Sequence, residues 1–293
     1  MQSACIGMHA PRATINMLPL TDMRPSDETC LYSTLLFVDT QARKLNMPCA
    51  CITFDQPLWF KAVEITKAAA LNNVVCRLGG FHLLSFLGYI GSVMLGSGLQ
   101  ELTGFVYGAH TVEHMLAGKA VARAIRAHLL IQSALTTLLL HQITHTSGDA
   151  GGDGESSTDD DVGDIANLCT TVAEAECDYD NTDILQCAIL QKVDQQLQCV
   201  KQRLSASSRT ATLWVKYIYY VDVCKMFIVA ERTGNWHLHL QAVHNMLNLI
   251  AATGHTHYSQ CARLYLQMMF DLPTDHPWLY DVFIRHGFNQ CCQ

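Results

Sequence analysis

Asp55 lies between an apolar run and a helical pattern. In α/β proteins, catalytic and ligand-binding residues often occupy such a position. The run CACITF (49–54) is rich in β-branched and apolar residues and predicts a buried strand, and Pro57 predicts a helix directly after it. Ligands bind at the carboxyl ends of strands in open α/β sheets, where a carboxylate can hold a divalent metal for phosphoryl transfer. The other interpretation is that Asp55 only caps the helix.

Histidine and cysteine recur at spacings that raise the possibility of a metal site. Cys76 and His82 are six residues apart, and His257 and Cys261 are four apart and would share a helix face. A structural zinc site needs four ligands, and no CxxC or HExxH accompanies these pairs. The chain also lacks GxxxxGK[ST], GxSxG and a GxGxxG after a strand. We therefore expect these side chains to pack in the core.

Glu231 and Arg232 are the only charged residues between Phe227 and Ile250. They lie in the segment ERTGNW, which is expected to end one helix and start the next. A charge within an apolar neighbourhood is either paired or functional. Two interpretations follow, an Arg232 that pairs within the fold or an acid that takes part in a site.

The first 80 residues alternate between helical and strand patterns. Ser26 and the acids after it predict the start of a helix at 27–46, and VVCRL (74–78) predicts a second buried strand. The order helix, strand, helix, strand, helix implies parallel strands in an α/β fold that is predominantly helical. Helical patterns then cover 82–145, with Gly88, Gly91 and the GSG at 96–98 as kinks or breaks, and 183–204, 211–231, 236–252, 256–271 and 277–286, with Pro273 and Pro277 punctuating the last two.

Periodicity and charge together divide the chain into four segments. These are an irregular lead (1–25), an α/β segment with further helices (26–146), an acidic disordered linker (147–182) and a helical region (183–293). Twelve acids lie between Asp149 and Asp183, so the rest has 26 − 12 = 14 acids against 19 bases. The body is therefore mildly basic, with about 19 − 14 = +5 charges.

A helix expected from Thr111 onward carries Lys119, Arg123 and Arg126 three or four residues apart on one face. This face could contact DNA phosphates or could simply be solvated.

Composition indicates an intracellular protein of the nucleus or cytoplasm. Most of the thirteen cysteines lie in apolar runs, no Asn-x-Ser/Thr acceptor occurs, and MQSACIGMHAPRAT does not resemble a signal peptide. Two stretches, 79–100 and 128–147, are uncharged and long enough to span a membrane, although their polar residues favour buried helices. A two-span membrane protein stays as a further alternative.

Four blocks of sequence taken together resemble a family of uncharacterised animal proteins that derive from transposable elements. The blocks are CITFDQPLWFKAVEI, VVCRLGGFHLLSFLGYIG, GKAVARAIRAH and AERTGNWHLHLQAVHNML. The presumed relatives of this family are the DDE transposases, including Mutator-like transposases, with a ribonuclease-H-like fold. The resemblance implies a partial ribonuclease-H-like parallel sheet with a large helical insertion.

The resemblance also implies roles for particular residues. Asp55 would be the second metal-binding acid, Cys76 and His82 would echo a Cys/His motif, and Glu231 would be the last acid, with Glu101 and Glu113 as alternatives.

The first three strands and the first metal-binding acid of such a fold find no match in the lead. We therefore expect a partial, transposon-derived chain without transposase or nuclease activity by itself. Mg²⁺ would be its cofactor only if activity remained. DNA or another protein is the expected partner, and the alternative is a helical protein- or DNA-interaction module. The oligomeric state and the DNA target stay open.

Overall fold

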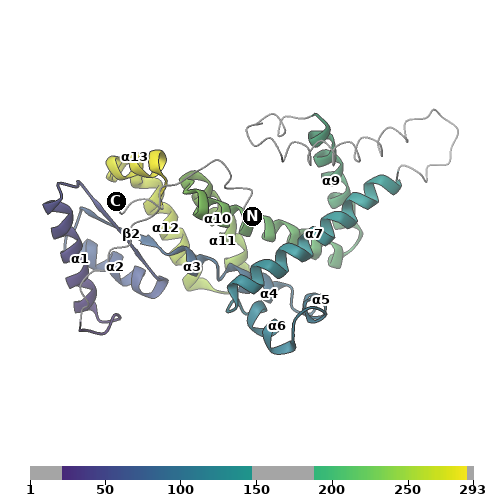
Figure 1. Cartoon of the computed structure of the whole chain (residues 1–293), viewed down its shortest axis with the longest axis horizontal. Coiled ribbons are helices and arrows are strands. Elements are labelled where there is room, and N and C mark those ends of the chain that lie inside the picture. Colours follow the sequence, from purple (N-terminus) through teal and green to yellow (C-terminus); the bar gives the residue numbers. More distant parts are fainter. Residues whose placement is uncertain (1–21, 147–187, 289–293) are drawn as a thin grey trace.

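The computed structural model describes residues 22–146 and 188–288. Over these residues the chain is predominantly helical and contains a small parallel sheet (Figure 1). The predicted acidic linker and most of the predicted irregular lead lie outside the described residues. In chain order the elements are α1 (Glu28–Lys44), β1 (Ala50–Phe54), α2 (Gln56–Ala68), β2 (Val74–Leu78), α3 (Gly80–Leu83), α4 (Phe86–Val93), α5 (Leu99–Gly104), α6 (Ala109–Leu116), α7 (Val121–Thr146), α9 (Ala188–Ser207), α10 (Arg209–Thr233), α11 (Trp236–Ala252), α12 (Thr256–Asp275) and α13 (Pro277–His286).

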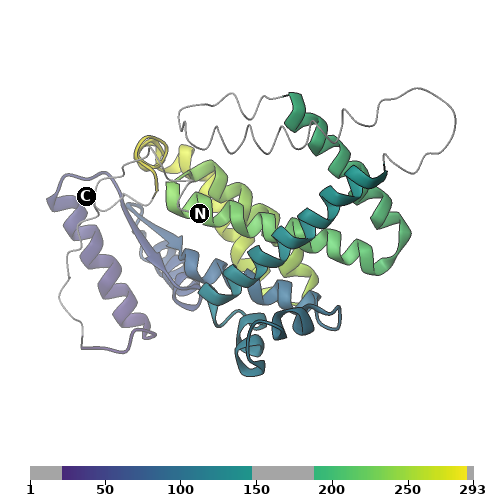
Figure 2. The ribbon, with the colours of Figure 1, turned by 45° about the vertical axis from the view of Figure 1, so that its right-hand side comes forward.

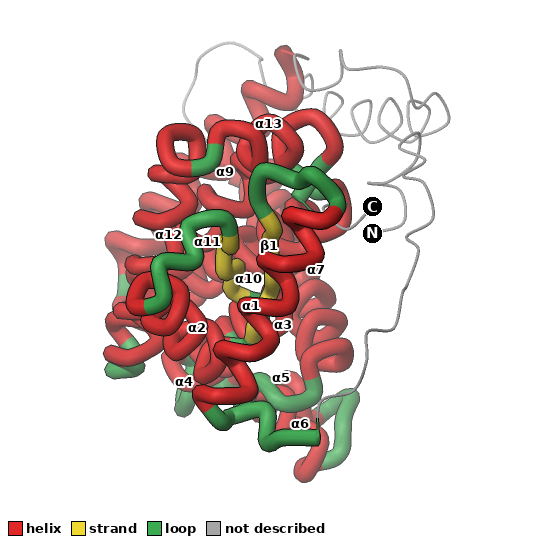
Figure 3. Tube along the Cα trace, turned by 90° about the vertical axis from the view of Figure 1, so that its left-hand side faces the viewer, coloured by secondary structure: helices red, strands yellow, loops and turns green. Residues whose placement is uncertain are grey.

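The two strands pair in parallel, as the order of helical and strand patterns predicted. They are in register from Ala50 opposite Val74 to Phe54 opposite Leu78. All of β2 is buried, whereas β1 is partly exposed. Helices α1 and α2 pack against each other and against the strands, which Figure 3 shows from the α1 side. The carboxyl ends of both strands therefore meet at one edge of the sheet.

Short polar side chains determine where the helices around the sheet begin. The carboxylate of Asp27 caps α1 by accepting a hydrogen bond from the backbone N–H of Thr29 at 2.8 Å, so the cap predicted at Ser26 is wrong by one residue. Asp55 caps α2, and Pro57 lies in its first turn. A cap of this kind contributes about 1 kcal/mol because it satisfies a backbone N–H that the helix leaves unpaired.

Trp59 of α2 joins the sheet to the C-terminal helices. Its side chain is fully buried, and its indole N–H donates to the carbonyl oxygen of Cys76 in β2 at 3.0 Å. Its ring packs edge-on against Tyr265 of α12, with the centroids 6.0 Å apart. A continuous cluster of buried side chains extends from Leu35 in α1 to Phe288 after α13. The segments before and after 147–187 therefore share a hydrophobic core.

Gly88 and Gly91 lie inside α4, so the prediction that they break a helix is wrong. Their role is close packing, because α4 crosses the end of α6. A Cβ atom on Gly91 would lie well inside van der Waals contact of the carbonyl oxygen of Leu116, and one on Gly88 would lie 3.0 Å from that of Ala117. The break predicted at 96–98 is confirmed, and both of its glycines have positive φ.

The helix predicted from Thr111 onward is interrupted. Gly118 has a φ of +72° and separates α6 from α7. Lys119 consequently lies in the connection before α7, and not on one helix with Arg123 and Arg126. These two arginines are exposed near the start of α7. The predicted basic face is therefore reduced to two helical positions and one loop position.

Helices α7 and α9 pack against each other and against α10 (Figure 2). Between α7 and α10, the Nδ1 atom of His128 lies 2.9 Å from the hydroxyl of Tyr217. The amide of Gln132 donates to the carbonyl oxygen of Ile218 at 3.0 Å and to Oδ1 of Asp222 at 2.6 Å. Burial lowers the pKa of His128 to about 4, so the ring is neutral where it bonds Tyr217.

The later helices follow the predicted ranges with small differences at their ends. α11 and α13 have the predicted bounds, and α10 is two residues longer at each end. α12 continues through Pro273 to Asp275, so the helix end predicted before this proline is wrong. α9 runs from Ala188 to Ser207, and the predicted residues 183–187 lie outside the described ranges.

The two long uncharged stretches belong to different kinds of element. Residues 79–100 are divided among α3, α4 and the start of α5, whereas 128–146 form the greater part of α7. In the part of the chain that the structure describes, no helix is long and apolar enough to cross a membrane.

No disulfide bond joins two of the seven cysteines in the described ranges. Burial raises the pKa of Cys49, Cys76 and Cys224 to about 12, which makes them packing residues and not nucleophiles.

Candidate functional site at the carboxyl edge of the sheet

Asp55 follows β1 directly, at the edge where the sequence placed a possible metal ligand. Its backbone is extended, and its Oδ1 atom accepts a hydrogen bond from the backbone N–H of Leu58 at 3.1 Å. The backbone oxygen of the preceding Phe54 accepts from Gly79 N at 2.8 Å, which carries the strand pairing one residue beyond β2. Asp55 is therefore engaged as a helix cap at the end of the paired strands.

Glu231 reaches the same edge from the last turn of α10. A Cβ atom built on Gly80 would lie 2.7 Å from its Oε2 atom, so the carboxylate rests against the glycine backbone that follows β2. A side chain at this position would displace the carboxylate. The structure thus brings Asp55 and Glu231, 176 positions apart in the sequence, to the ends of neighbouring strands.

Arg77 of β2 supplies the positive charge that faces Glu231. Its Nη2 atom lies 3.6 Å from Oε2 of the carboxylate. Its Nη1 atom donates to the carbonyl oxygen of Phe288 at 3.2 Å, and the guanidinium lies over the Phe288 ring at 4.4 Å from the centroid. The side chain is 9% exposed. A buried guanidinium needs such partners because its charge has lost most of its hydration.

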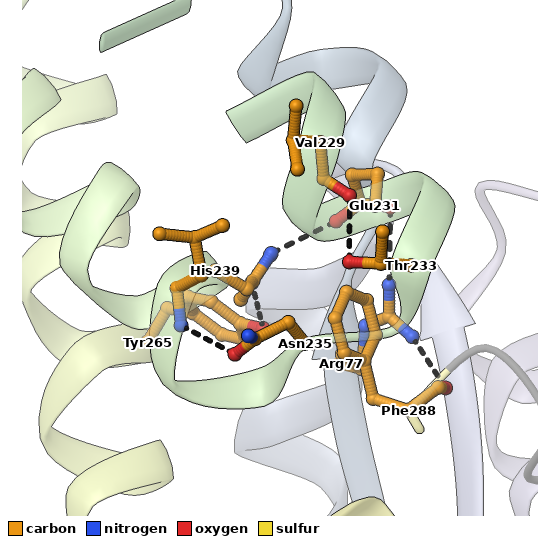
Figure 4. A network of polar contacts seen from close by, with 9 residues as sticks. Arg77, Val229, Glu231, Thr233, Asn235, His239, Tyr265 and Phe288 are labelled. Carbon is orange, nitrogen blue, oxygen red and sulfur yellow. Dashed lines mark hydrogen bonds and ion pairs between the residues drawn. The ribbon is translucent and has the colours of Figure 1, made fainter. Parts of the chain in front are cut away.

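His239 of α11 holds the other oxygen of the Glu231 carboxylate. Its Nδ1 atom lies 2.8 Å from Oε1, and its Nε2 atom lies 2.9 Å from the hydroxyl of Tyr265 (Figure 4). Burial lowers the pKa of His239, although the neighbouring Glu231 opposes this shift. Burial also raises the pKa of Tyr265, which stays protonated. A neutral ring can therefore donate its Nδ1 proton to Glu231 and accept the Tyr265 hydroxyl at Nε2.

A tight turn between α10 and α11 positions these groups. Gly234 has a φ of +70° and ends α10, and the side chain of Asn235 caps α11 by accepting from the N–H of Leu238 at 3.0 Å. The turn lies against Gly287, which also has positive φ, and the N–H of Phe288 donates to the oxygen of Gly234 at 3.3 Å. These contacts place the Phe288 ring beside Arg77 and His239 (Figure 4).

The arrangement resembles a carboxylate–imidazole–hydroxyl relay, but its terminal group is inaccessible. Tyr265 and His239 are both fully buried, so no substrate can reach the hydroxyl. The Glu231 carboxylate is 25% exposed, and both of its oxygens already have partners. The Arg77 guanidinium faces Oε2, and His239 Nδ1 lies beside Oε1. A metal ion would have to compete with the Arg77 charge. The chemistry that this geometry supports is a polar tie between β2, α10, α11, α12 and the segment after α13.

The structure places the other residues of the predicted Cys/His pairs as follows. Cys76 is buried within β2, and the side chain of His82 lies outside the described residues. His257 is exposed on α12 while Cys261 is buried, which agrees with packing for the cysteine. Within 22–146 and 188–288, no group of three or more His, Cys, Asp or Glu side chains could hold a metal ion.

Among the candidate last acids, Glu231 is the one that contacts Gly80. Glu101 of α5 and Glu113 of α6 are exposed on other helices. The prediction that Arg232 pairs within the fold is not met in the described ranges, where Arg232 is exposed and no ion pair joins it to another described residue. The partners of Glu231 come instead from Arg77 and from His239.

Four residues of the network were not predicted, namely Arg77, His239, Tyr265 and Phe288. A signal for Arg77 was present, because VVCRL carries one arginine in a strand that is otherwise apolar. A buried strand with a charged residue requires an opposite charge elsewhere in the fold. His239 gave no such signal, since a histidine in an apolar helix is compatible with many environments.

Comparison with known proteins identifies the family. The whole chain, residues 1–293, matches the family described as Domain of unknown function (DUF8702). The protein belongs to this family. Neither the curated proteins nor the solved structures contain a match to it.

Proposed function

We propose that this DUF8702 protein derives from a DDE transposase with a ribonuclease-H-like fold and has no metal-dependent nuclease or transposase activity of its own. The observation that carries the proposal is the state of the two acids at the carboxyl edge of the sheet. Asp55 caps α2, and Glu231 is neutralised by Arg77 and bonded to His239. Two-metal phosphoryl transfer needs carboxylates that are free to face a cation.

The parallel pairing of β1 and β2 and the helices that separate them from Glu231 support the ribonuclease-H-like origin. The resemblance assigns Asp55 to the end of a strand and Glu231 to a helix that follows a helical insertion. Their meeting at one edge agrees with that assignment. In this proposal the edge has become a structural element, with the Arg77 cation in the place of a metal charge.

The test is a nicking assay on supercoiled plasmid with the full chain and Mg²⁺ or Mn²⁺. We expect no turnover above a metal-only control, and no change with Asp55→Asn or Glu231→Gln. Asp271→Asn, an exposed acid on α12, serves as the matched control. Metal-dependent nicking that Asp55→Asn abolishes and Asp271→Asn preserves would overturn the proposal.

A second candidate function, duplex DNA binding, rests on the exposed arginines of α7. Arg123 and Arg126 lie one helical turn apart, and Lys119 precedes them in the connection from α6. No ion pair joins these three to another described residue. Exposed cations are available to phosphate oxygens, and contacts with phosphate release counterions and make binding salt-dependent.

Fluorescence anisotropy with a duplex at several salt concentrations tests this second function. Reversing both charges, Arg123→Glu with Arg126→Glu, should weaken binding and lower the slope of log K against log[salt] by about 2, because each phosphate contact contributes about 0.9. Arg263→Glu, a reversal at an exposed position of α12, is the control. Equal effects of both sets, or no binding at low salt, would exclude this face as a DNA site.

A further inference from the structure

Two histidine side chains on α6 are in direct contact with each other. His110 and His114 are one helical turn apart, and their Nε2 atoms are separated by 3.1 Å. The ring centroids are 4.4 Å apart and the ring planes are nearly perpendicular. His110 is exposed and His114 is half-buried, so both rings are open to solvent on one face of the helix.

We propose that His110 and His114 form a bidentate site for a late first-row divalent metal ion of the Zn²⁺ and Cu²⁺ class. An imidazole nitrogen binds zinc at about 2.0–2.1 Å. Two nitrogens at this radius and 3.1 Å apart subtend an angle of about 95–102° at the ion. That angle lies between the roughly 90° of tetragonal copper and the roughly 109° of tetrahedral zinc, so one ion fits both ligands without moving the backbone.

The helix that carries the pair is packed on its opposite side and at its end. Val112 and Met115 bury the opposite side of α6 in the core. The end of α6 rests against α4, where Gly88 and Gly91 allow the backbones to touch. A preorganised pair loses little conformational entropy on binding, so the chelate gains affinity over a single exposed histidine.

The chemistry of the pair restricts which ions it accepts. Imidazole is a ligand for zinc, copper and nickel, whereas magnesium prefers oxygen ligands and its own water. No third His, Cys, Asp or Glu in the described ranges completes the set, so water fills the remaining positions.

Protection from diethyl pyrocarbonate, mapped by peptide mass spectrometry on the full chain, tests the site residue by residue. Zn²⁺ should slow the modification of both His110 and His114 by about tenfold or more, since the lone pair at Nε2 is occupied. The exposed His257 reports on non-specific metal effects, and its rate should not change. Mg²⁺ at the same concentration should protect none of the three.

The variant His110→Gln makes the outcome decisive, because it removes one ligand at an exposed position and leaves His114 as the reporter. In this variant Zn²⁺ should protect His114 far less than in the parent chain. Protection of His114 that survives His110→Gln unchanged would overturn the bidentate site. The absence of protection at millimolar Zn²⁺ would overturn it as well. Plasmid nicking does not enter this test, so its result is independent of the proposed function.

Discussion

The substitution Glu231→Gln tests whether the carboxylate of Glu231 stabilises the fold or serves a function at a cost to stability. The substitution keeps the shape of the side chain and an oxygen that can accept the Nδ1 proton of His239, but removes the negative charge opposite Arg77. If the carboxylate is part of a structural tie, its loss leaves the Arg77 guanidinium, 9% exposed, without its counter-charge. A functional acid held in place at a cost to stability would behave in the opposite way, because removing its charge relieves that cost.

The expected size of the effect follows from the geometry. Breaking a fully buried ion pair by removing one partner costs about 3–5 kcal/mol. Here the carboxylate is 25% exposed and its distance to Nη2 is 3.6 Å, so water screens part of the interaction. The hydrogen bond to His239 also survives in part. We therefore expect Glu231→Gln to lower the free energy of unfolding by about 1–3 kcal/mol, which corresponds to a few degrees in Tm for a chain of this size.

Urea unfolding followed by far-UV circular dichroism measures this change, with Asp271→Asn as an exposed control expected within about 0.5 kcal/mol of the parent chain. A double-mutant cycle with Arg77→Met then isolates the pair. Since Arg77 and Glu231 interact directly, the coupling should be about 1–2 kcal/mol. A stability equal to or above that of the parent chain for Glu231→Gln, or a coupling near zero, would refute the structural interpretation.

Three further predictions concern single positions. Burial lowers the pKa of His128 from 6.5 to about 4, so the unfolded state binds the proton first as the pH falls. This group therefore removes up to roughly (6.5 − 4) × 1.36, or about 3 kcal/mol, of stability between pH 6.5 and pH 4. His128→Asn should reduce the pH dependence of the urea midpoint over this window, and a pH dependence parallel to that of the parent chain would contradict the prediction. Gly91→Ala should cost about 2–4 kcal/mol in urea unfolding because the new Cβ meets backbone of α6, whereas Gly104→Ala, with nothing within 4 Å, should cost little; equal effects would disprove the close packing. Asp55→Ala should lower stability by about 1 kcal/mol while Asp55→Asn keeps most of the cap; an equal loss from both would show that the charge, and not the cap, matters.

Local patterns predicted much of the fold around the sheet. The run CACITF, the proline at position 57 and the run VVCRL led to two strands and the helix between them, because strand propensity and helix starts depend on neighbours within a few residues. Helix ends were less accurate. A continuous helix from Thr111 was expected, whereas residues 117–120, with Gly118 at positive φ, form a connection between α6 and α7.

The candidate site was predictable in part for the same reason. Asp55 was placed correctly because its position follows from the strand before it and the helix after it. Glu231 was recognised as an unusual charge, yet its partners were not predicted. The actual partners, Arg77 and His239, come from β2 and α11, and no local pattern relates these positions.

The sequence by itself therefore determined the two strands, the cap at Asp55, most helix ranges and the presence of a charge at 231 that needed a partner. Only the tertiary structure decided which groups meet at the carboxyl edge. Gly80 leaves room for the Glu231 carboxylate, whose Oε2 atom lies 3.6 Å from Nη2 of Arg77. The physical reason is that hydrogen bonds within helices and strands connect near neighbours, whereas ion pairs and close backbone contacts depend on how whole elements pack.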